Sequence, residues 1–316
     1  MAYLRLCGRN YPADAQDLPC DTIPFTIYTM STTRIACIGS GNMGFALMKS
    51  IASVLGGKNI GFADVDTEKA AAAAAALGTE VYNSNIEAAA EGNFIFLAVK
   101  PQILAEVLKE IAPIVRKRLT GANAPVLVSM AAGWTISRIQ SVLADGASAG
   151  DTPAKAPLAA PVARIMPNTP ALISKGLIAL AASPEVTVEN AAKLETMLNR
   201  AGTVDRIDEN YLNAVTGLSG SGPAFAYLFI EALADGGVLA GLPHEKALLY
   251  AAQTVLGSAA MVLETGKRPG ELKDMVCSPG GTTIAGVAVL EAGAFRSSVI
   301  QAVKAAWQRS AELQKI

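Results

Sequence analysis

The chain has 316 residues, of which 51% are hydrophobic, 17% charged and only 5% aromatic, and its formal net charge is −1. A chain of this length can bury a large core and is expected to divide into two domains. The near-zero charge provides no basic field for nucleic acid or for an anionic membrane, so we expect neither as a partner.

The four cysteines argue against a metal site and for a reducing compartment. Cys7, Cys20, Cys37 and Cys277 form no CxxC pair and no metal-ligand spacing. We therefore expect no bound metal and a cytoplasmic location.

Residues 1–33 resemble no targeting segment. They lack the continuous apolar run of a secretory signal, and they contain acidic residues that transit peptides avoid. Because Met30 stands just before the first predicted strand, we interpret this segment as a mis-assigned start or a disordered extension. No later stretch reaches 18 uncharged apolar residues, which argues against a membrane span.

A glycine-rich turn organises the first half of the chain. An apolar run at Ile35–Ile38 predicts a buried strand, and Phe45–Leu55 continues as an apolar helical run. Between them lie Gly39, Gly41 and Gly44 at the GxGxxG spacing. These glycines serve a tight turn, close approach to a pyrophosphate and close helix–strand packing. The phosphates would lie at the positive end of the helix.

The second predicted strand supports dinucleotide binding. The run Asn59–Ala63 is followed by Asp64, 20 residues after Gly44, where an acidic side chain can hold a ribose 2′-hydroxyl. A purely structural βαβ turn is the alternative interpretation.

The pattern continues to alternate up to residue 207. Further strands are predicted at 80–82, 94–99, 126–130, 162–166, 176–182 and 202–207, and helices at 66–77, 86–91, 102–116, 136–143 and 186–200. This alternation predicts an α/β fold, a Rossmann-type doubly wound sheet over 34–207. The Ala/Gly/Ser/Pro-rich stretch 144–161 is predicted to be a surface insertion.

Only helices are predicted in the remaining domain, 208–316. They cover 211–218, 223–240, 244–265, 270–276, 282–292 and 295–314. Several are apolar almost all round, as is typical of helices buried in a bundle or at an oligomer interface. We therefore expect an all-helical dimerisation domain and an intertwined homodimer.

The chain offers little acid–base equipment. Its one histidine, His244, lies at a predicted helix start. A second stretch with chemical potential is Ser278–Thr283, in which Ser278 is predicted to cap a helix and Pro279 to be its first residue. Free N–H groups would then suit a carboxylate, although a well-capped helix explains the same residues. The small residues of 215–223 are interpreted mainly as a close helix contact.

Seven motifs in chain order resemble the pyrroline-5-carboxylate reductase family. They are GSGNMG (39–44), AVKPQ (98–102), AAG (131–133), MPNTP (166–170), AVTGLSGSGPAF (214–225), ALADGG (232–237) and SPGGTTI (278–284). The resemblance implies reduction of L-Δ1-pyrroline-5-carboxylate to L-proline by NADPH or NADH, the final step of proline biosynthesis. It also implies an interlocked homodimer, often assembled into a ring of dimers.

The resemblance implies cofactor-binding roles for three groups of residues. The pyrophosphate would lie on Gly39, Ser40, Gly41, Asn42, Met43 and Gly44. The nicotinamide ribose would pass Ala98, Val99, Lys100, Pro101, Ala132 and Gly133. Asn85 corresponds to a ribose-contacting asparagine of the family.

The resemblance also implies a substrate site. Gly281, Thr282 and Thr283 would bind the carboxylate with Ser278 beside them, and the Thr283 hydroxyl, the catalytic group, would meet the ring nitrogen. Glu209 matches an acidic position near the substrate in some members of the family. Met275 departs from relatives that have asparagine there, so that polar contact is not expected.

The expected reaction fits the shortage of histidines. A cyclic imine accepts hydride once its nitrogen is protonated or hydrogen-bonded, so the protein has mainly to align the reactants. Asp64 would repel a 2′-phosphate, and Lys69 is the only cation near it in the sequence. We therefore expect NADH to be accepted at least as well as NADPH.

Two alternatives remain at this stage. A β-hydroxyacid-type dehydrogenase would need a suitably spaced lysine, which Lys246, Lys267 and Lys273 do not provide. A non-catalytic dinucleotide-binding protein would bind NADH without reducing the imine.

Overall fold

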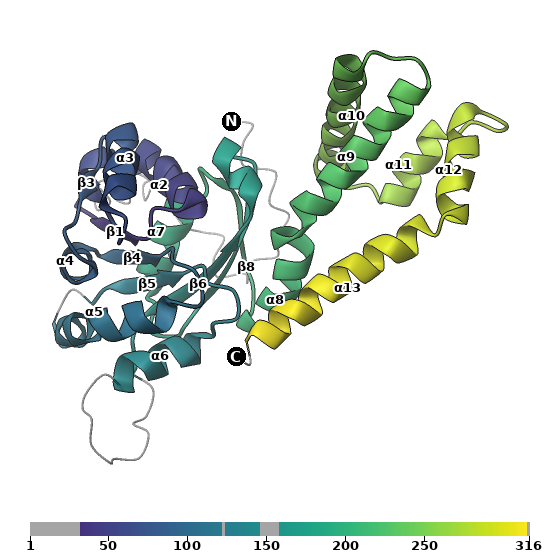
Figure 1. The fold of residues 1–316 in the computed structure, drawn as a ribbon. Coiled ribbons are helices and arrows are strands. Elements are labelled where there is room, and N and C mark those ends of the chain that lie inside the picture. The colour runs from purple at the N-terminus through teal and green to yellow at the C-terminus, as the bar shows by residue number, and fades with distance from the viewer. Residues whose placement is uncertain (1–31, 122–123, 146–157, 315–316) are drawn as a thin grey trace, which may run out of the picture. The chain divides into compact units, whose positions relative to one another are not determined.

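A computed structural model describes residues 32–121, 124–145 and 158–314 (Figure 1). It divides into two compact units. The helical unit is Gly222–Lys304, and the α/β unit contains the described residues up to Ser221 and those from Ala305 onward. The predicted extension 1–33 and the predicted insertion 144–161 lie mostly outside the described residues.

The α/β unit is built on one eight-stranded sheet with the order β3-β2-β1-β4-β5-β6-β7-β8. Its strands are β1 (Ile35–Ile38), β2 (Ile60–Ala63), β3 (Glu80–Val81), β4 (Phe94–Leu97), β5 (Val126–Ser129), β6 (Val162–Pro167), β7 (Gly176–Ala182) and β8 (Gly202–Arg206). Neighbours are parallel except β6 and β7. Only the short 3-10 turn η3 (Thr169–Ile173) joins that pair, too little chain for a parallel crossover.

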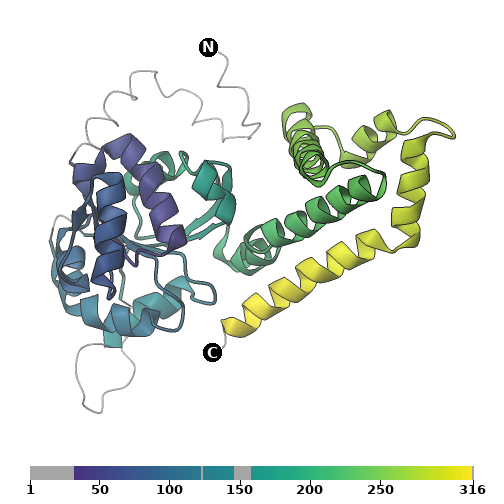
Figure 2. The same ribbon diagram turned by 45° about the horizontal axis from the view of Figure 1, so that its top comes forward.

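Helices cover both faces of the sheet (Figures 1 and 2). One layer contains α2 (Asn42–Leu55), α3 (Thr67–Leu77) and α7 (Val188–Leu198), and the other α4 (Asn85–Glu91), α5 (Leu104–Leu119) and α6 (Ile136–Asp145). In β1, Ile35 and Cys37 pack into the first layer, Ala36 and Ile38 into the second. A strand buried on both faces reads as a continuous apolar run, which is why the sequence signal was strong.

Local capping fixes several helix boundaries. The Asp66 side chain accepts a hydrogen bond from the Lys69 N–H at the start of α3, and Gly78 ends that helix with φ 63°. The helix thus begins one residue after the start of the predicted helix at 66–77 and ends where that helix was predicted to end. Helix α2 begins at Asn42, three residues earlier than predicted, because Gly41 is already its extended N-cap.

The segment between sheet and helical unit differs from the predicted helix at 211–218. It comprises a 3-10 turn, η4 (Glu209–Tyr211), a short α8 (Leu212–Val215) and a π-helical turn, η5 (Thr216–Gly220). The glycines in η5 are poor α-helix formers, and the Thr216 hydroxyl bonds back to the Leu212 carbonyl at 2.8 Å.

The helical unit follows the predicted order. It comprises α9 (Gly222–Leu239), α10 (His244–Thr265), α11 (Pro269–Val276), α12 (Thr282–Ala292) and the first part of α13 (Phe295–Leu313). Helices α9 and α10 pack through a small alanine-rich contact that includes Ala234 and Ala247, and the rings of Phe229 and Phe295 meet at 5.6 Å.

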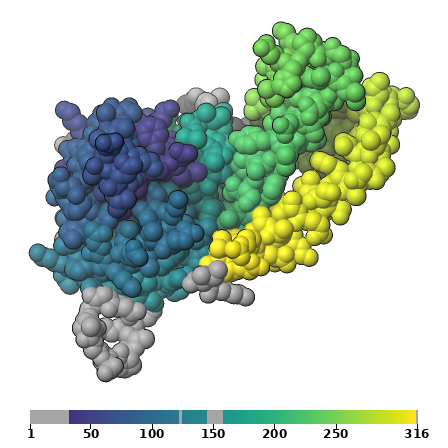
Figure 3. Space-filling model, in the orientation of Figure 1, coloured from purple at the N-terminus to yellow at the C-terminus, as the bar shows by residue number. Residues whose placement is uncertain are grey.

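Most apolar side chains of these helices are exposed in the single chain, whose surface Figure 3 presents. Leu239 is 91% exposed, Leu263 79% and Val289 71%, so a large apolar surface is left uncovered. By length and composition alone, Glu209–Leu239 and His244–Thr265 could cross a membrane, and the bent pair α12–α13 would be a third such segment. The expectation that no segment suits a membrane span is therefore wrong by the criterion of length and composition. Polar but uncharged residues interrupt the apolar runs of these helices, but they do not lower the mean hydropathy enough to exclude a span.

Candidate active site

The three glycines of the glycine-rich turn are constrained by their surroundings in different ways. Gly39 has φ +103°, and a Cβ there would lie 2.6 Å from the Ala98 carbonyl oxygen. A Cβ on Gly44 would lie 2.7 Å from the Gly39 carbonyl oxygen. Gly39 therefore makes the tight turn, and Gly44 lets α2 pack closely on the strand, as predicted.

Gly41 is different because no atom of the described residues lies close to where its side chain would be. It has φ −66° and ψ 172°, which any residue adopts, and a Cβ there would meet no atom within 4 Å. Neither backbone strain nor packing in the α/β unit requires glycine here. An empty space at the amino end of a 14-residue helix is what close approach of a pyrophosphate requires.

Asp64, at the end of β2, is bound to the glycine-rich turn. Its Oδ2 accepts hydrogen bonds from the backbone N–H and the hydroxyl of Ser40, each at 2.7 Å, and its Oδ1 accepts one from the Asp66 N–H at 3.1 Å. Partial burial favours the neutral acid, but these hydrogen bonds, with Lys69 nearby, outweigh it and hold the pKa of Asp64 below its usual value. A carboxylate therefore faces the turn at neutral pH.

A groove of about 330 Å³ runs beside this turn and is called the cofactor groove below. Seven of the predicted cofactor residues line it: Gly39, Gly41, Asp64, Asn85, Ala98, Val99 and Lys100. The Asn85 amide donates to Glu110 Oε2 at 2.7 Å, which fixes its orientation. The sequence motifs are thus brought together as expected for parallel strands that end at one edge of a sheet.

The other predicted cofactor residues do not line the cofactor groove. Ser40 holds Asp64, and Gly44 is a buried residue of the first turn of α2. The rest are Asn42, Met43, Pro101, Ala132 and Gly133.

Sequence reasoning missed the apolar wall of the groove. Val65, Ile103 and Val107 line it, and Val65 is 92% exposed. An apolar residue directly after the strand-end acid was the available signal. Lys69 also lines the groove, beside Asp64.

The segment 131–136, which follows β5 and includes the first residue of α6, is called the β5–α6 loop below. The Trp134 indole N–H donates to the Pro101 carbonyl at 2.9 Å, and Trp134 is only 4% exposed. The Arg138 guanidinium lies 4.2 Å from the centre of its ring. Trp134 therefore joins this loop to the one that follows β4.

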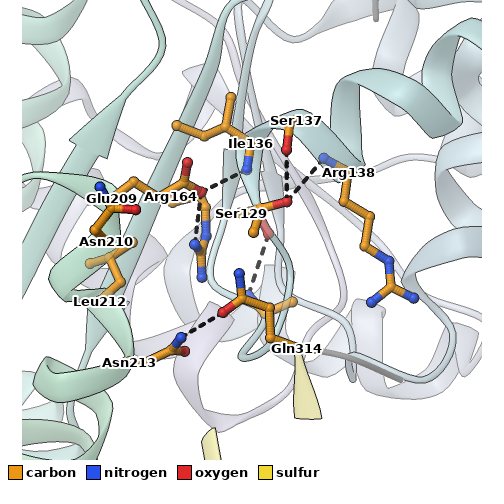
Figure 4. Close-up of polar contacts among 12 residues, drawn as sticks. Ser129, Ile136, Ser137, Arg138, Arg164, Glu209, Asn210, Leu212, Asn213 and Gln314 are labelled. Atoms are coloured by element: carbon orange, nitrogen blue, oxygen red, sulfur yellow. Dashed lines mark hydrogen bonds and ion pairs between the residues drawn. The ribbon is translucent and has the colours of Figure 1, made fainter. Parts of the chain in front are cut away.

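Glu209 is bound within the α/β unit through one of its two carboxylate oxygens. Its Oε1 accepts from the Ile136 N–H at 2.7 Å and from Arg164 Nη1 at 2.8 Å (Figure 4). The Arg164 side chain is 5% exposed and that of Glu209 is 29% exposed. Burial lowers the pKa of Arg164, although Glu209 opposes this effect. Glu209 thus neutralises a buried cation and caps the first N–H of α6.

The predicted substrate turn lies in the helical unit. The N-cap of α12 is Gly281, with no side-chain cap, so the prediction that Ser278 caps the helix and Pro279 starts it is wrong. Gly280 has φ +67°, which turns the chain after Pro279, and the helix begins three residues later than that capping prediction implied. The first free N–H groups therefore belong to Thr282 and Thr283.

Other residues near this turn are exposed. Met275 is 66% exposed, and Lys267 Nζ lies 3.8 Å from its sulfur. His244 is exposed at the first residue of α10. Within residues 32–121, 124–145 and 158–314, no three His, Cys, Asp or Glu residues gather in a way that could hold a metal.

Two different parts of the chain match two different family models. Residues 34–133 match a family model described as "NADP oxidoreductase coenzyme F420-dependent", and residues 209–313 match "Pyrroline-5-carboxylate reductase dimerisation". The chain is 48% identical over 231 residues to the pyrroline-5-carboxylate reductase of Synechocystis, a match that covers 73% of this chain and 79% of that one. It is 39% identical to the Escherichia coli enzyme over 285 residues, 89% of this chain and 98% of that one. The chain belongs to the pyrroline-5-carboxylate reductase family.

Solved structures of this family share the fold. The Coxiella burnetii reductase has a TM-score of 0.78 at 31% identity and covers 90% of this chain and 100% of its own. The Plasmodium falciparum reductase, solved with NADP bound, has a TM-score of 0.75 at 29% identity over 90% and 99% of the two chains. The predicted family, the fold class and the assignment as an NAD(P)H-dependent reductase that forms proline are confirmed, and residues 209–313 are a dimerisation domain.

Proposed function

We propose that the cofactor groove holds the nicotinamide dinucleotide and that the amino end of α12 holds the carboxylate of pyrroline-5-carboxylate. The observation that carries the proposal is the empty space at Gly41. It lies between two glycines whose own surroundings leave no room for a side chain. A protein that used this turn only for its fold would not need glycine at position 41.

Each element beside the cofactor groove has a distinct task toward the dinucleotide. The free N–H groups at the start of α2 would bind the pyrophosphate, and Asp64 would accept from the adenosine ribose. Val65 and Ile103 offer apolar contact to the adenine, while Ala98 to Lys100 would border the nicotinamide ribose. The nicotinamide, when bound, supplies the hydride.

The amino end of α12 supplies the substrate contacts. The N–H groups of Thr282 and Thr283 point out of the helix end, where its dipole favours a carboxylate. Gly281, Ser278 and the Thr283 hydroxyl complete the proposed site, with the hydroxyl hydrogen-bonded to the ring nitrogen. Product formation adds a hydride to C5 and a proton to that nitrogen.

Alignment provides most of the proposed rate enhancement. Holding two reactants in a productive geometry can lower a barrier by roughly 7–11 kcal/mol, whereas a general acid or base typically contributes about 10²–10⁴-fold. An enzyme of this type needs no histidine, in agreement with an exposed His244 at a helix start.

We propose that NADH serves at least as well as NADPH. The ionised Asp64 would repel a 2′-phosphate, while Lys69 on the same groove would attract it. Asp64 lies directly after β2, as ribose-binding acids do, and Lys69 is a flexible, exposed side chain in α3.

We propose that a second copy of this chain covers the apolar helices. Leu239, Leu263 and Val289 lie within the segment that matches the family's dimerisation domain, so protein rather than lipid is their partner. We also propose that such dimers assemble into rings and that the protein is cytoplasmic. Sedimentation of a folded monomer at micromolar concentration would contradict the dimer.

One assay tests the proposed function. Purified protein is mixed with pyrroline-5-carboxylate and either NADH or NADPH, and cofactor oxidation is followed at equal concentrations. Proline must accumulate in proportion to the cofactor consumed, and the kcat/KM with NADH should equal or exceed that with NADPH. Binding of NADH with no reduction of the imine would leave only a dinucleotide-binding protein.

A further inference from the structure

The β5–α6 loop is held by side chains from distant parts of the α/β unit. On one side the Trp134 indole N–H bonds the Pro101 carbonyl at 2.9 Å, directly after Lys100 of the cofactor groove. On the other side Glu209 accepts the Ile136 N–H at 2.7 Å. Neither contact is needed to form the sheet, because both lie beyond its strand ends.

The end of the chain adds a third contact. Gly133 has φ +75°, and a Cβ there would lie 2.8 Å from the Leu313 carbonyl oxygen, so the last turn of α13 packs directly on the β5–α6 loop. Glu209 and Leu313 are the first and last residues of the dimerisation match, and both abut this one loop.

The chemistry of Glu209 argues for a mechanical role. Its carboxylate is shared between a nearly buried guanidinium and the first N–H of α6 (Figure 4). Removing it to bind a substrate would leave Arg164 without its charge partner in a buried site, which is strongly unfavourable. Both contacts use Oε1, so a substrate that took this oxygen would compete with the ion pair.

We propose that Trp134 and Glu209 are positioning residues that fix the β5–α6 loop, and with it Ala132 and Gly133, beside the cofactor groove. The inference rests on the proposed function, because it presumes that the nicotinamide end of the cofactor passes these residues. It replaces the predicted substrate contact of Glu209 with an action on the cofactor side.

Two variants and two matched controls test the positioning role. Trp134→Phe removes the indole donor and keeps an aromatic face for Arg138, and Glu209→Gln keeps an acceptor for Ile136 but removes the charge. Trp307→Phe is the control for the first, since Trp307 is the other tryptophan and is 46% exposed. Glu195→Gln is the control for the second, since Glu195 pairs with Arg206 and its side chain is also 29% exposed.

Calorimetric titration gives the Kd for NADH, and steady-state kinetics at saturating NADH gives the KM for the imine. We expect the Kd to rise about 3–10-fold in Trp134→Phe, as the loss of one hydrogen bond implies. It should rise at least as much in Glu209→Gln, with the imine KM within twofold of wild type in both. The two controls should match wild type.

Fluorescence provides a readout that a merely structural role would not change. In a Trp307→Phe background Trp134 is the single tryptophan, so its emission should be quenched by energy transfer to bound NADH. Adding Glu209→Gln should shift that emission to longer wavelength before NADH is added, because the loosened loop admits water to Trp134.

Two outcomes would overturn the inference. A raised imine KM with an unchanged NADH Kd in Glu209→Gln would make Glu209 a substrate contact, and wild-type Kd values in both variants would remove the positioning role. If Glu209→Gln does not fold, Trp134→Phe decides alone. Gly41→Ala tells failure of this inference apart from failure of the proposed function. If Gly41→Ala binds NADH normally, the assignment of the cofactor groove is wrong. If Gly41→Ala alone binds NADH weakly, that assignment stands and the β5–α6 loop has no positioning role.

Discussion

The two halves of the proposed active site are built in opposite ways. The glycine-rich turn follows β1, in which every residue is buried, and its shape is fixed by backbone contacts within 3 Å of where side chains would stand. Helix α12 contains no buried residue at all. The glycine-rich turn is therefore fixed within one chain, while α12 lacks the packing that would hold it rigid.

This difference shows what dimerisation is expected to supply. An exposed apolar helix is poorly held in a single chain, since most helical stability comes from packing of its apolar face. A second copy covering α12 would fix the direction of its first N–H groups. We therefore expect cofactor binding to be insensitive to assembly and imine reduction to depend on it.

The largest expected effect breaks the substrate half alone. Thr283→Ala should lower kcat/KM for the imine by about 10²–10⁴-fold, because the hydrogen bond to the ring nitrogen is lost. Thr283→Ser, which keeps the hydroxyl, is the matched control and should stay within about tenfold of wild type. Unchanged turnover in Thr283→Ala would remove this residue from the mechanism.

The next largest effect is a difference in the free energy of unfolding between variants of Gly39 and Gly41. Gly39→Ala should lower the free energy of unfolding by about 2–4 kcal/mol, because it combines overpacking against Ala98 with a left-handed backbone. Gly41→Ala should change it by less than about 0.5 kcal/mol, as expected where no contact is altered. Chemical denaturation followed by circular dichroism measures both, and equal losses would contradict the division of tasks.

These glycine roles could be predicted from the sequence because a short-range motif encodes them. The strand, turn and helix that carry Gly39 and Gly44 are contiguous, and apolar runs mark both elements. The helices from α9 to α13 were predicted within one residue for the same reason, since Gly or Pro separates most of them, whereas the helix predicted at 211–218 was not found as such.

The features that could not be predicted from the sequence depend mostly on contacts between residues far apart in the chain. Glu209 meets Arg164 across 45 residues and Ile136 across 73, and Trp134 meets Pro101 across 33. No periodicity reports such pairs. The wrong cap at Ser278 has a local cause instead, since Gly280 adopts a left-handed conformation that Ser-Pro alone does not indicate.

A smaller effect concerns the choice of cofactor. Asp64→Ser should raise the ratio of kcat/KM with NADPH to that with NADH by about tenfold, roughly the value of a 1.4 kcal/mol change in charge interaction. Lys69→Gln is the companion variant and should move the ratio in the opposite direction. A ratio unaffected by Asp64→Ser would mean that this carboxylate does not face the adenosine ribose.

The smallest expected effect is a pH dependence of stability. The pKa of Asp64 is lowered in the folded chain, so its contribution to stability is present above the unfolded pKa of about 3.9 and is lost as pH falls through the folded value. Wild type should therefore have a higher thermal midpoint than Asp64→Asn at pH 7, and the gap should close toward pH 3. A gap that widens in acid would contradict this assignment.

The most direct test crosses the two halves of the site in one experiment. NADH affinity by calorimetry and single-turnover imine reduction at saturating NADH are measured in Gly41→Ala and in Thr283→Ala. Gly41→Ala should weaken NADH binding at least tenfold and spare the reduction step, and Thr283→Ala should do the reverse. If both variants lose the same property, the turn and the helix do not hold separate ligands, and the proposed active site is wrong.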